Sequence, residues 1–153
     1  MNIQSILSPA RVRCHLDGGS KKRVLEDIAN LIVADHPAVN ADELFRRLIS
    51  RERLGSTGVG NGVAIPHCRV ENCSTTLGSL ISLRKAIDFE SPDGKPVDLL
   101  FTLLVPEEAH DEHLQTLAAL AQAFSNETIL AKLRSAGDDE QLYVCAQEVF
   151  ENL

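Results

Sequence analysis

The sequence predicts an α/β sandwich, in which a central mixed sheet is flanked by helices on both faces. Three observations support this class. Helical and β-rich patterns are interleaved along the chain. The segment Val97–Val105 is almost continuously apolar, which is typical of a central strand buried on both faces. The length of 153 residues with 44% hydrophobic residues suffices for one sizeable core, so we expect a single domain spanning 1–153.

The first third of the chain predicts one strand and two helices. Residues 10–16 alternate weakly and predict a strand that ends at Gly18-Gly19. Apolar residues at helical spacing then predict a helix over 20–34, with Ser20 as its N-cap. His36-Pro37 ends that helix. A second helix begins at Asn40 or Asp42, and its apolar face comprises Leu44, Phe45, Leu48 and Ile49.

The remainder of the chain opens with its densest glycine stretch, residues 55–62, which runs directly into a short strand over Val63–His67. Pro66 either interrupts that strand or places it at an edge of the sheet. A second β-rich run covers 75–83, a turn covers 92–95, and Pro106 ends the central strand. Helical patterns follow over 111–124, 126–134 and 138–150, the last with acidic residues at its positive end.

Composition excludes several classes of function. The 15 basic and 22 acidic residues give a net charge of −7, which disfavours a nucleic-acid partner because such binding needs a basic surface. Only 4% of the residues are aromatic, so a base-stacking platform is not expected. No apolar run approaches the length of a membrane span, and the N-terminus does not resemble a signal peptide. We therefore expect a cytoplasmic protein without membrane insertion.

His67 is the first candidate for chemistry. A glycine-rich turn allows backbone N–H groups to approach an anion, and this histidine follows such a turn at the end of a strand. Pro66 stiffens the local backbone, which can then aim the imidazole. The alternative from the residues alone is an ordinary, partly buried histidine. The glycines match neither a Walker loop nor the dinucleotide fingerprint.

Arg51 and His113 are the second and third candidates. Arg51 shares a helical face with Leu44 and Leu48, so it faces inward at the rim of the core, where a guanidinium can meet a phosphate or carboxylate. The alternative is an arginine whose stem covers the core while its head stays in water. His113 lies in the first turn of its helix, where free N–H groups favour anions. His110 lies close to the same face, so spacing does not separate the two histidines.

Two cysteines and the pair His110 and His113 suggest two further possibilities, a redox pair and a metal site. Cys68 and Cys73 are spaced like a redox pair, but we interpret both as small apolar residues that fill space in the core. No CxxC pair is present, which disfavours a zinc ribbon or a disulfide scaffold. The run His110-Asp-Glu-His113 differs from the His-Glu-x-x-His motif, and no third ligand is evident nearby, so no metal site is expected.

The run from Arg51 to His67, RERLGSTGVGNGVAIPH, closely resembles the active-site segment of enzyme IIA proteins of the mannitol/fructose class, and more narrowly their nitrogen-regulatory branch. These proteins belong to the bacterial phosphoenolpyruvate-dependent phosphotransferase system. The segment Glu112–Leu117, EHLQTL, resembles the second histidine motif of that family. The similarity covers nearly the whole chain, as expected for one IIA type 2 domain.

The resemblance implies an α/β sandwich and a phosphohistidine carrier. In this family the histidine matching His67 is phosphorylated. The histidine matching His113 and the arginine matching Arg51 flank it. The implied partners are a histidine-phosphorylated carrier protein as donor and unidentified regulatory targets, with no cofactor and no metal. Some relatives have glycine at the position of Cys68.

Three alternatives remain open at the level of sequence. The first keeps the same fold and chemistry in a fructose/mannitol-class sugar uptake system. The second is a metal-dependent hydrolase that uses His67, His110 and His113. The third is a binding module that is never phosphorylated.

Overall fold

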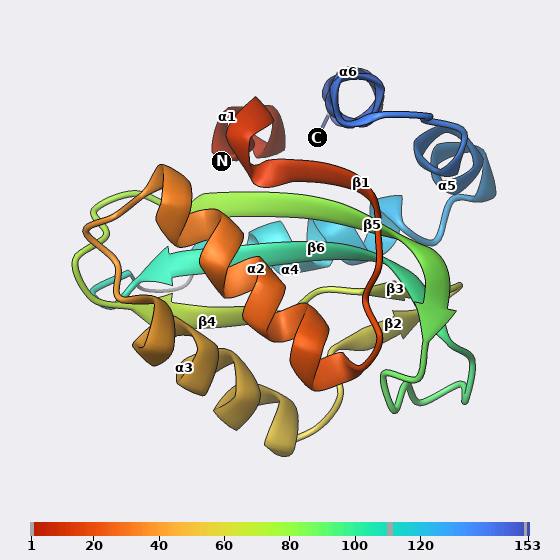
Figure 1. Cartoon of the computed structure of the whole chain (residues 1–153). Helices are drawn as coiled ribbons and strands as arrows, with labels where there is room; N and C mark the ends of the chain where they lie inside the picture. The colour runs from red at the N-terminus through yellow and green to blue at the C-terminus, as the bar shows by residue number, and fades with distance from the viewer. Residues whose placement is uncertain (1, 110–111, 152) are drawn as a thin grey trace.

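The computed structural model describes residues 2–109, 112–151 and 153. In that part of the chain, six strands form one sheet, and helices cover both of its faces (Figure 1). The strands are β1 (Val12–Leu16), β2 (Gly58–Gly60), β3 (Val63–Ala64), β4 (His67–Val70), β5 (Leu77–Ile87) and β6 (Val97–Pro106). The helices are α1 (Ile3–Ile6), the 3-10 turn η1 (Pro9–Arg11), α2 (Lys21–Asp35), α3 (Ala41–Arg53), α4 (Glu112–Ala123), α5 (Glu127–Arg134) and α6 (Asp139–Val149).

The sheet is mixed, with the order β1-β5-β6-β3-β2 and with β4 also paired to β6. β1 runs parallel to β5, and β5 and β6 form the long antiparallel pair at the centre. β3 and β4 both run parallel to β6, whereas β2 is antiparallel to β3. The predicted fold class is therefore confirmed.

The second edge of β6 is paired by two short strands in succession. Val63 and Ala64 of β3 face Leu99 and Leu100, and β4 resumes the pairing at His67, opposite Leu103. Between them, Pro66 has no N–H to donate, but its carbonyl accepts a hydrogen bond from the Leu103 amide at 2.9 Å. The interruption predicted at Pro66 is thus present, and His67 is the first residue after it.

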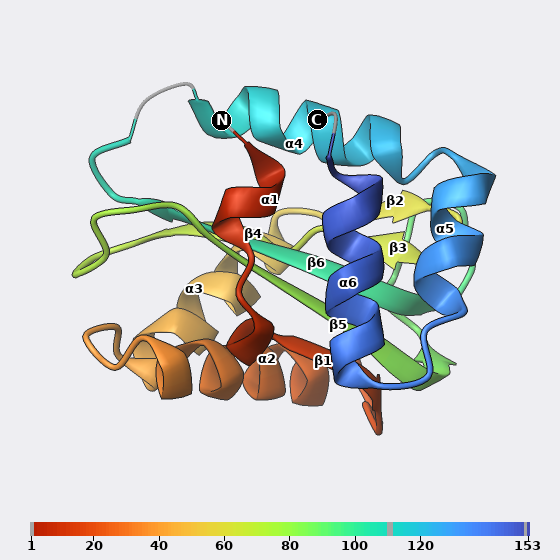
Figure 2. The same cartoon turned by 90° about the horizontal axis from the view of Figure 1, so that it is seen from above.

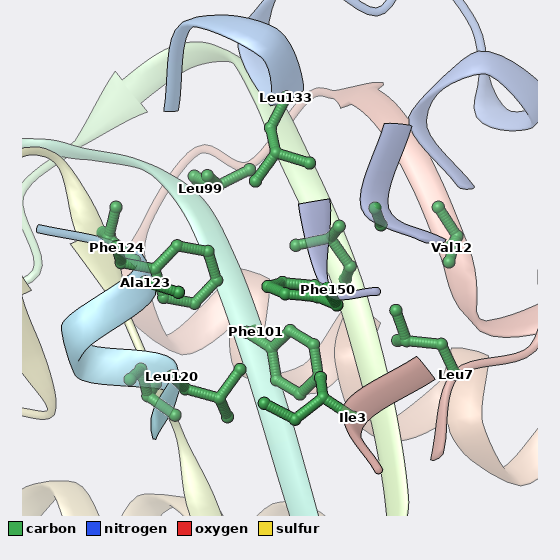
Figure 3. Packing of buried hydrophobic residues seen from close by; sticks show 14 of the residues in the cluster. Ile3, Leu7, Val12, Leu99, Phe101, Leu120, Ala123, Phe124, Leu133 and Phe150 are labelled. Atoms are coloured by element: carbon green, nitrogen blue, oxygen red, sulfur yellow. The ribbon is translucent and has the colours of Figure 1, made fainter. Parts of the chain in front are cut away.

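Each face of the sheet carries its own hydrophobic core. The first core lies under α1, α4, α5 and α6, and the second lies under α2 and α3, as the view from above shows (Figure 2). Phe101 of β6 is fully buried at the centre of the first core (Figure 3). Its ring packs edge-on against Phe150 at 5.8 Å and tilted against Phe124 at 6.3 Å, arrangements that aromatic pairs prefer.

The helix boundaries follow the capping residues in the sequence. Ser20, Asn40 and Asp138 each accept a hydrogen bond from a backbone amide in the first turn of α2, α3 and α6. Four elements differ from the predictions. The glycine stretch contains β2, α1 precedes the first predicted strand, and β5 extends to Ile87 rather than ending at residue 83. The strand predicted over 63–67 ends at Ala64, and His67 begins the separate strand β4 instead of ending a strand. His110 and Asp111 lie outside the described residues, so the helix predicted from 111 is described from Glu112.

The outer edge of the sheet at β1 is short and irregular. Its register with β5 shifts between Arg13 and Leu16, and His15 has a φ of 57°. The amide of Cys14 donates to Asp139 Oδ1 of α6 at 2.7 Å. The Asp139 carboxylate therefore satisfies a backbone N–H group of the edge strand. None of the described helices combines the length and the apolar character needed to cross a bilayer.

The first prediction concerns the Phe101 ring. The Phe101→Ala substitution should lower the free energy of unfolding by about 3–5 kcal/mol, because it leaves a cavity among Phe124, Phe150 and their neighbours. Denaturant unfolding followed by circular dichroism measures the loss. The control is Val144→Ala on α6, whose side chain is 47% exposed and which should change stability by about 0.5 kcal/mol or less. Equal losses in the two variants would contradict this description of the core.

Candidate functional site

A cleft of about 470 Å³ lies where α3, the strands β4 and β6, and the first turn of α4 meet. All three residues predicted from the sequence, Arg51, His67 and His113, line this cleft, although they come from three different elements. The other residues that line it are Glu43, Arg46, Arg47, Ser50, Leu54, Cys68, Arg69, Leu103 and Val105.

His67 is held by the backbone that precedes it. Its Nδ1 lies 2.8 Å from the carbonyl oxygen of Ile65, so Nδ1–H donates to that oxygen. Ile65 and Pro66 are both buried, and Pro66 restricts the backbone between the carbonyl and the ring. With its proton on Nδ1, the neutral imidazole keeps an electron pair on Nε2, which is therefore the nitrogen available as a nucleophile.

The surroundings favour the neutral form of His67. Burial lowers the pKa of His67 below its ordinary value of 6.5, and the positive charge of Arg51 and the neighbouring His113 ring lower it further. The hydrogen bond to Ile65 and the negative charge of Glu52 act in the opposite direction without reversing the shift. The lowered pKa favours the neutral imidazole at pH 7, and in this form one ring nitrogen has a free electron pair.

Arg51 occupies the last turn of α3, on the side that its helical phase predicts. One guanidinium nitrogen, Nη1, donates to the carbonyl oxygen of Gly55 at 2.9 Å. This bond ties the guanidinium to the glycine-rich segment, and the remaining N–H groups belong to a fork that suits phosphate or carboxylate. His113 is half-buried in the first turn of α4, where backbone N–H groups favour a bound anion.

Sequence reasoning missed three arginines of the cleft, namely Arg46, Arg47 and Arg69. Arg47 precedes Arg51 by one helical turn, and Arg69 follows His67 by two residues in a strand. Both spacings place the arginine on the same face as a predicted site residue, so the sequence could have indicated them. Arg47 Nη1 donates to the carbonyl oxygen of Arg69 at 3.0 Å, which joins α3 to β4. Arg69 in turn donates to the carbonyl oxygen of Ala109, in the segment that leads toward His113.

The lining of the cleft is strongly cationic, in contrast to the net negative charge of the chain. Four arginines face one carboxylate, that of Glu43, and the two histidines add ring N–H groups. Arg47 is neutralised in part by Glu43 at 3.1 Å and Glu107 at 3.5 Å. The excess of positive charge and N–H donors makes the cleft suited to an anion such as a phosphoryl group.

Cys68 also lines the cleft, next to His67. Burial raises the pKa of its thiol to about 12, so Cys68 is a neutral thiol at physiological pH rather than a nucleophilic thiolate. Cys73 is buried, and its Sγ contacts the carbonyl oxygen of Thr75. Both residues are free cysteines.

The hydrolase alternative requires several ligands at metal-binding distance. Among residues 2–109, 112–151 and 153, no three His, Cys, Asp or Glu side chains form a group that could hold a metal ion. His110, which that alternative also used, lies outside the described residues.

One exposed leucine lines the cleft, and a second exposed leucine follows His113 in the sequence. Leu54, at the end of α3, is 85% exposed, and Leu114, directly after His113, is 58% exposed. Leu54 also contributes to the cleft lining. Apolar side chains this exposed beside a charged cleft are typical of a surface that another protein covers.

Comparisons with known proteins show which proteins the chain resembles. Residues 5–148 match the family model described as "Phosphoenolpyruvate-dependent sugar phosphotransferase system, EIIA 2". The chain is 46% identical to the nitrogen regulatory protein of Pseudomonas aeruginosa over 97% of both chains. It is 39% identical to the nitrogen regulatory protein of Escherichia coli, over 94% of this chain and 88% of that protein. The crystal structure of nitrogen regulatory protein IIA-Ntr from Neisseria meningitidis superposes with a TM-score of 0.86 at 39% identity, over 94% of this chain and 97% of that chain.

The second prediction follows from the lowered pKa of His67. A titration of its ring protons by NMR should give a midpoint below 6.5, whereas the urea-unfolded chain should titrate near 6.5. At a pH between the folded-state and unfolded-state pKa of His67, the unfolded chain binds more protons than the folded chain does. The stability contributed by neutral His67 is therefore complete above pH 6.5 and is lost as the pH falls through the folded-state pKa. The spectrum of His67→Ala assigns the signal, and a midpoint at or above 6.5 would contradict the burial argument.

Proposed function

The chain belongs to the EIIA type 2 family of the phosphoenolpyruvate-dependent sugar phosphotransferase system, within its nitrogen-regulatory branch, and we propose that His67 is its phosphoryl acceptor. The donor is a histidine-phosphorylated carrier protein, and the phosphorylation state of His67 governs binding to regulatory targets. The chain acts as one EIIA unit in the cytoplasm, a compartment that suits its four free cysteines.

The observation that carries the proposal is the orientation of His67. Its Nδ1–H is occupied by the carbonyl oxygen of Ile65, and the ring lines a cleft rich in arginine. A nitrogen lone pair on Nε2 in a cationic cleft has both properties that a phosphoryl acceptor needs. It can attack phosphorus, and its surroundings stabilise the charge of the group that arrives.

The transfer moves a phosphoryl group from one imidazole to another. The electron pair on His67 Nε2 forms the new N–P bond while the N–P bond of the donor histidine breaks, and that electron pair returns to the donor nitrogen. The proton on Nδ1 of His67 stays in place, hydrogen-bonded to Ile65, so the acceptor needs no general base. The transition state is loose and in line, so catalysis consists of positioning and charge stabilisation.

Arg51 and His113 supply that stabilisation. Both line the cleft around His67, and both act on its ring electrostatically. We assign His113 as a hydrogen-bond donor to the phosphoryl oxygens and Arg51 as the charged group that supports them. Leu54 belongs to the surface on which the donor protein rests, because its exposed side chain lines the cleft.

The third prediction tests the acceptor. Incubation with phosphoenolpyruvate and the purified upstream phosphotransferases should raise the intact mass of the wild-type protein by one phosphoryl group. His67→Ala should abolish the gain while unfolding remains cooperative. The label should be lost in acid, because protonation of the ring nitrogen cleaves a phosphoramidate. Acid-stable label on Ser56 or Thr57, the hydroxyl residues of the glycine-rich segment, would refute the assignment. A wild-type protein that gains no phosphate would favour a binding module instead.

The fourth prediction separates transfer from stability at the flanking residues. His113→Ala and Arg51→Ala should each slow phosphoryl exchange by roughly a hundred- to thousand-fold, or about 2.7–4 kcal/mol, because each removes a donor aimed at transition-state charge. Their thermal stability should change by about 1 kcal/mol or less.

Matched controls come from the same two segments. Arg53→Ala removes an exposed arginine two residues beyond Arg51, and it should leave exchange close to the wild-type rate. His110→Ala should also have little effect, since only His113 precedes the sequence Leu-Gln-Thr-Leu. If His110→Ala is the slower of the two histidine variants, the assignment of His113 is wrong.

A further inference from the structure

Glu52 is a carboxylate in an unusual place. It follows Leu44 and Leu48 along the buried stripe of α3, and its residue surface is only 7% exposed. A charged group in such a position must be fully compensated by donors, because leaving it unpaired would cost several kcal/mol. The neighbouring Arg51 faces the cleft, so these two adjacent residues project in different directions.

Three donors compensate the Glu52 carboxylate. Oε1 accepts from the Thr57 amide at 3.1 Å and lies 3.1 Å from Lys21 Nζ, and Oε2 accepts from the Thr57 hydroxyl in a short bond. Lys21 is itself held by the carbonyl oxygen of Phe89 at 3.2 Å and lies over the Phe89 ring. Both donor groups of Thr57 therefore point at one carboxylate, which fixes this residue at the entrance of the glycine-rich segment.

The hydrogen bonds continue from Thr57 to the ring of His67. The carbonyl oxygen of Thr57 accepts from the Ile65 amide at 3.0 Å, and the carbonyl oxygen of Ile65 accepts from His67 Nδ1 at 2.8 Å. Ile65 is thus held at both its N–H and its carbonyl group. Four residues between positions 52 and 67, namely Glu52, Thr57, Ile65 and His67, form one continuous series of hydrogen bonds.

We propose that Glu52 and Thr57 are positioning residues for His67, acting through Ile65 to keep the imidazole in its Nδ1–H tautomer with Nε2 open to the cleft. The proposal rests on the role of His67 as acceptor described above. Neither residue touches the phosphoryl group in this assignment. Their contribution is to fix the direction of the Ile65 carbonyl, which selects the tautomer and the angle of the ring.

The tautomer matters because the two neutral forms of imidazole differ in reactivity at Nε2. The Nδ1–H form has an electron pair on Nε2, whereas the Nε2–H form has a proton there and cannot attack phosphorus. The observed rate scales with the fraction of molecules in the competent form. A shift of the Ile65 carbonyl lowers that fraction and turns the ring away from its productive angle.

A purely structural role of the Glu52 contacts makes a different prediction. In that case, loss of a contact lowers the stability of the chain, while the folded molecules keep the same tautomer and transfer rate. The test therefore needs a spectroscopic readout of His67 in addition to stability.

The experiment compares Glu52→Gln, Thr57→Val and Thr57→Ser with the wild-type protein, each labelled with ¹⁵N-histidine. Glu52→Gln keeps the size of the side chain and removes its charge. Thr57→Val keeps the shape and removes the hydroxyl, and Thr57→Ser restores it. The controls are Ser79→Ala, which removes a buried hydroxyl that donates to the carbonyl oxygen of Arg11 in η1, and Asp35→Asn, which removes the negative charge paired with Arg11.

Long-range ¹H–¹⁵N correlation spectra of the unphosphorylated proteins report which ring nitrogen of His67 carries the proton. We expect the Nδ1–H form in the wild type, the Thr57→Ser variant and both controls. In Glu52→Gln and Thr57→Val, the Nε2–H form should become populated. Phosphoryl transfer should fall about tenfold in these two variants, the size typical of outer partners of functional histidines.

Wild-type tautomer and transfer rate in Thr57→Val would overturn the proposal, and this variant decides the question even if Glu52→Gln fails to fold. A slower transfer with an unchanged tautomer would overturn it as well. Because the spectra need no phosphate, the two hypotheses fail separately. If wild-type protein gains no phosphoryl group but the tautomer of His67 still responds to Thr57, the acceptor role is wrong and the positioning role stands.

Discussion

The interrupted pairing along β6 is the constraint on which the site depends. A single strand from Val63 to Val70 would alternate its side chains regularly along the central strand. Pro66 prevents this, because it cannot donate a ladder hydrogen bond, and the chain instead pairs as β3, breaks, and pairs again as β4. The ring of His67 turns back to the carbonyl oxygen of Ile65 within this break. The nitrogen that we propose as the phosphoryl acceptor is therefore oriented by an interruption in the sheet, while the rest of β6 stays paired.

The cleft also depends on both layers of helices. α3 belongs to the layer over the second core and supplies Arg51, whereas α4 belongs to the opposite layer and supplies His113. β4 lies between them and carries His67 (Figure 1). Arg47 and Arg69 join these parts through backbone carbonyls, so the relative positions of the layers are held close to the site itself. A change in either core reaches the cleft through one of these helices.

Much of the fold could be predicted from the sequence, because hydrophobic patterns and caps are local signals. Val97–Val105 marked the central strand, and Ser20 marked a helix start, as the structure confirms. The three-residue strand β2 consists of glycine and valine and has no pattern to detect. The sequence indicated His67, Arg51 and His113 as candidates. It did not show that they line one cleft, because only tertiary packing brings the three side chains together. Glu52 went unnoticed because a carboxylate in an apolar stripe has meaning only once its donors are known.

The edge of the sheet at β1 has a consequence for the behaviour of the protein at high concentration. An open edge strand offers unpaired amides to a neighbouring molecule and so invites growth of the sheet from one copy to the next. Here the Cys14 amide already donates to Asp139, and the positive φ of His15 bends the strand out of regular register. Both features make this edge poorly suited to pairing with a strand of a second copy. The β1 edge lies at the opposite end of the strand order from β3 and β2, so the residues that protect it are separate from those that line the cleft, and each set can change without altering the other.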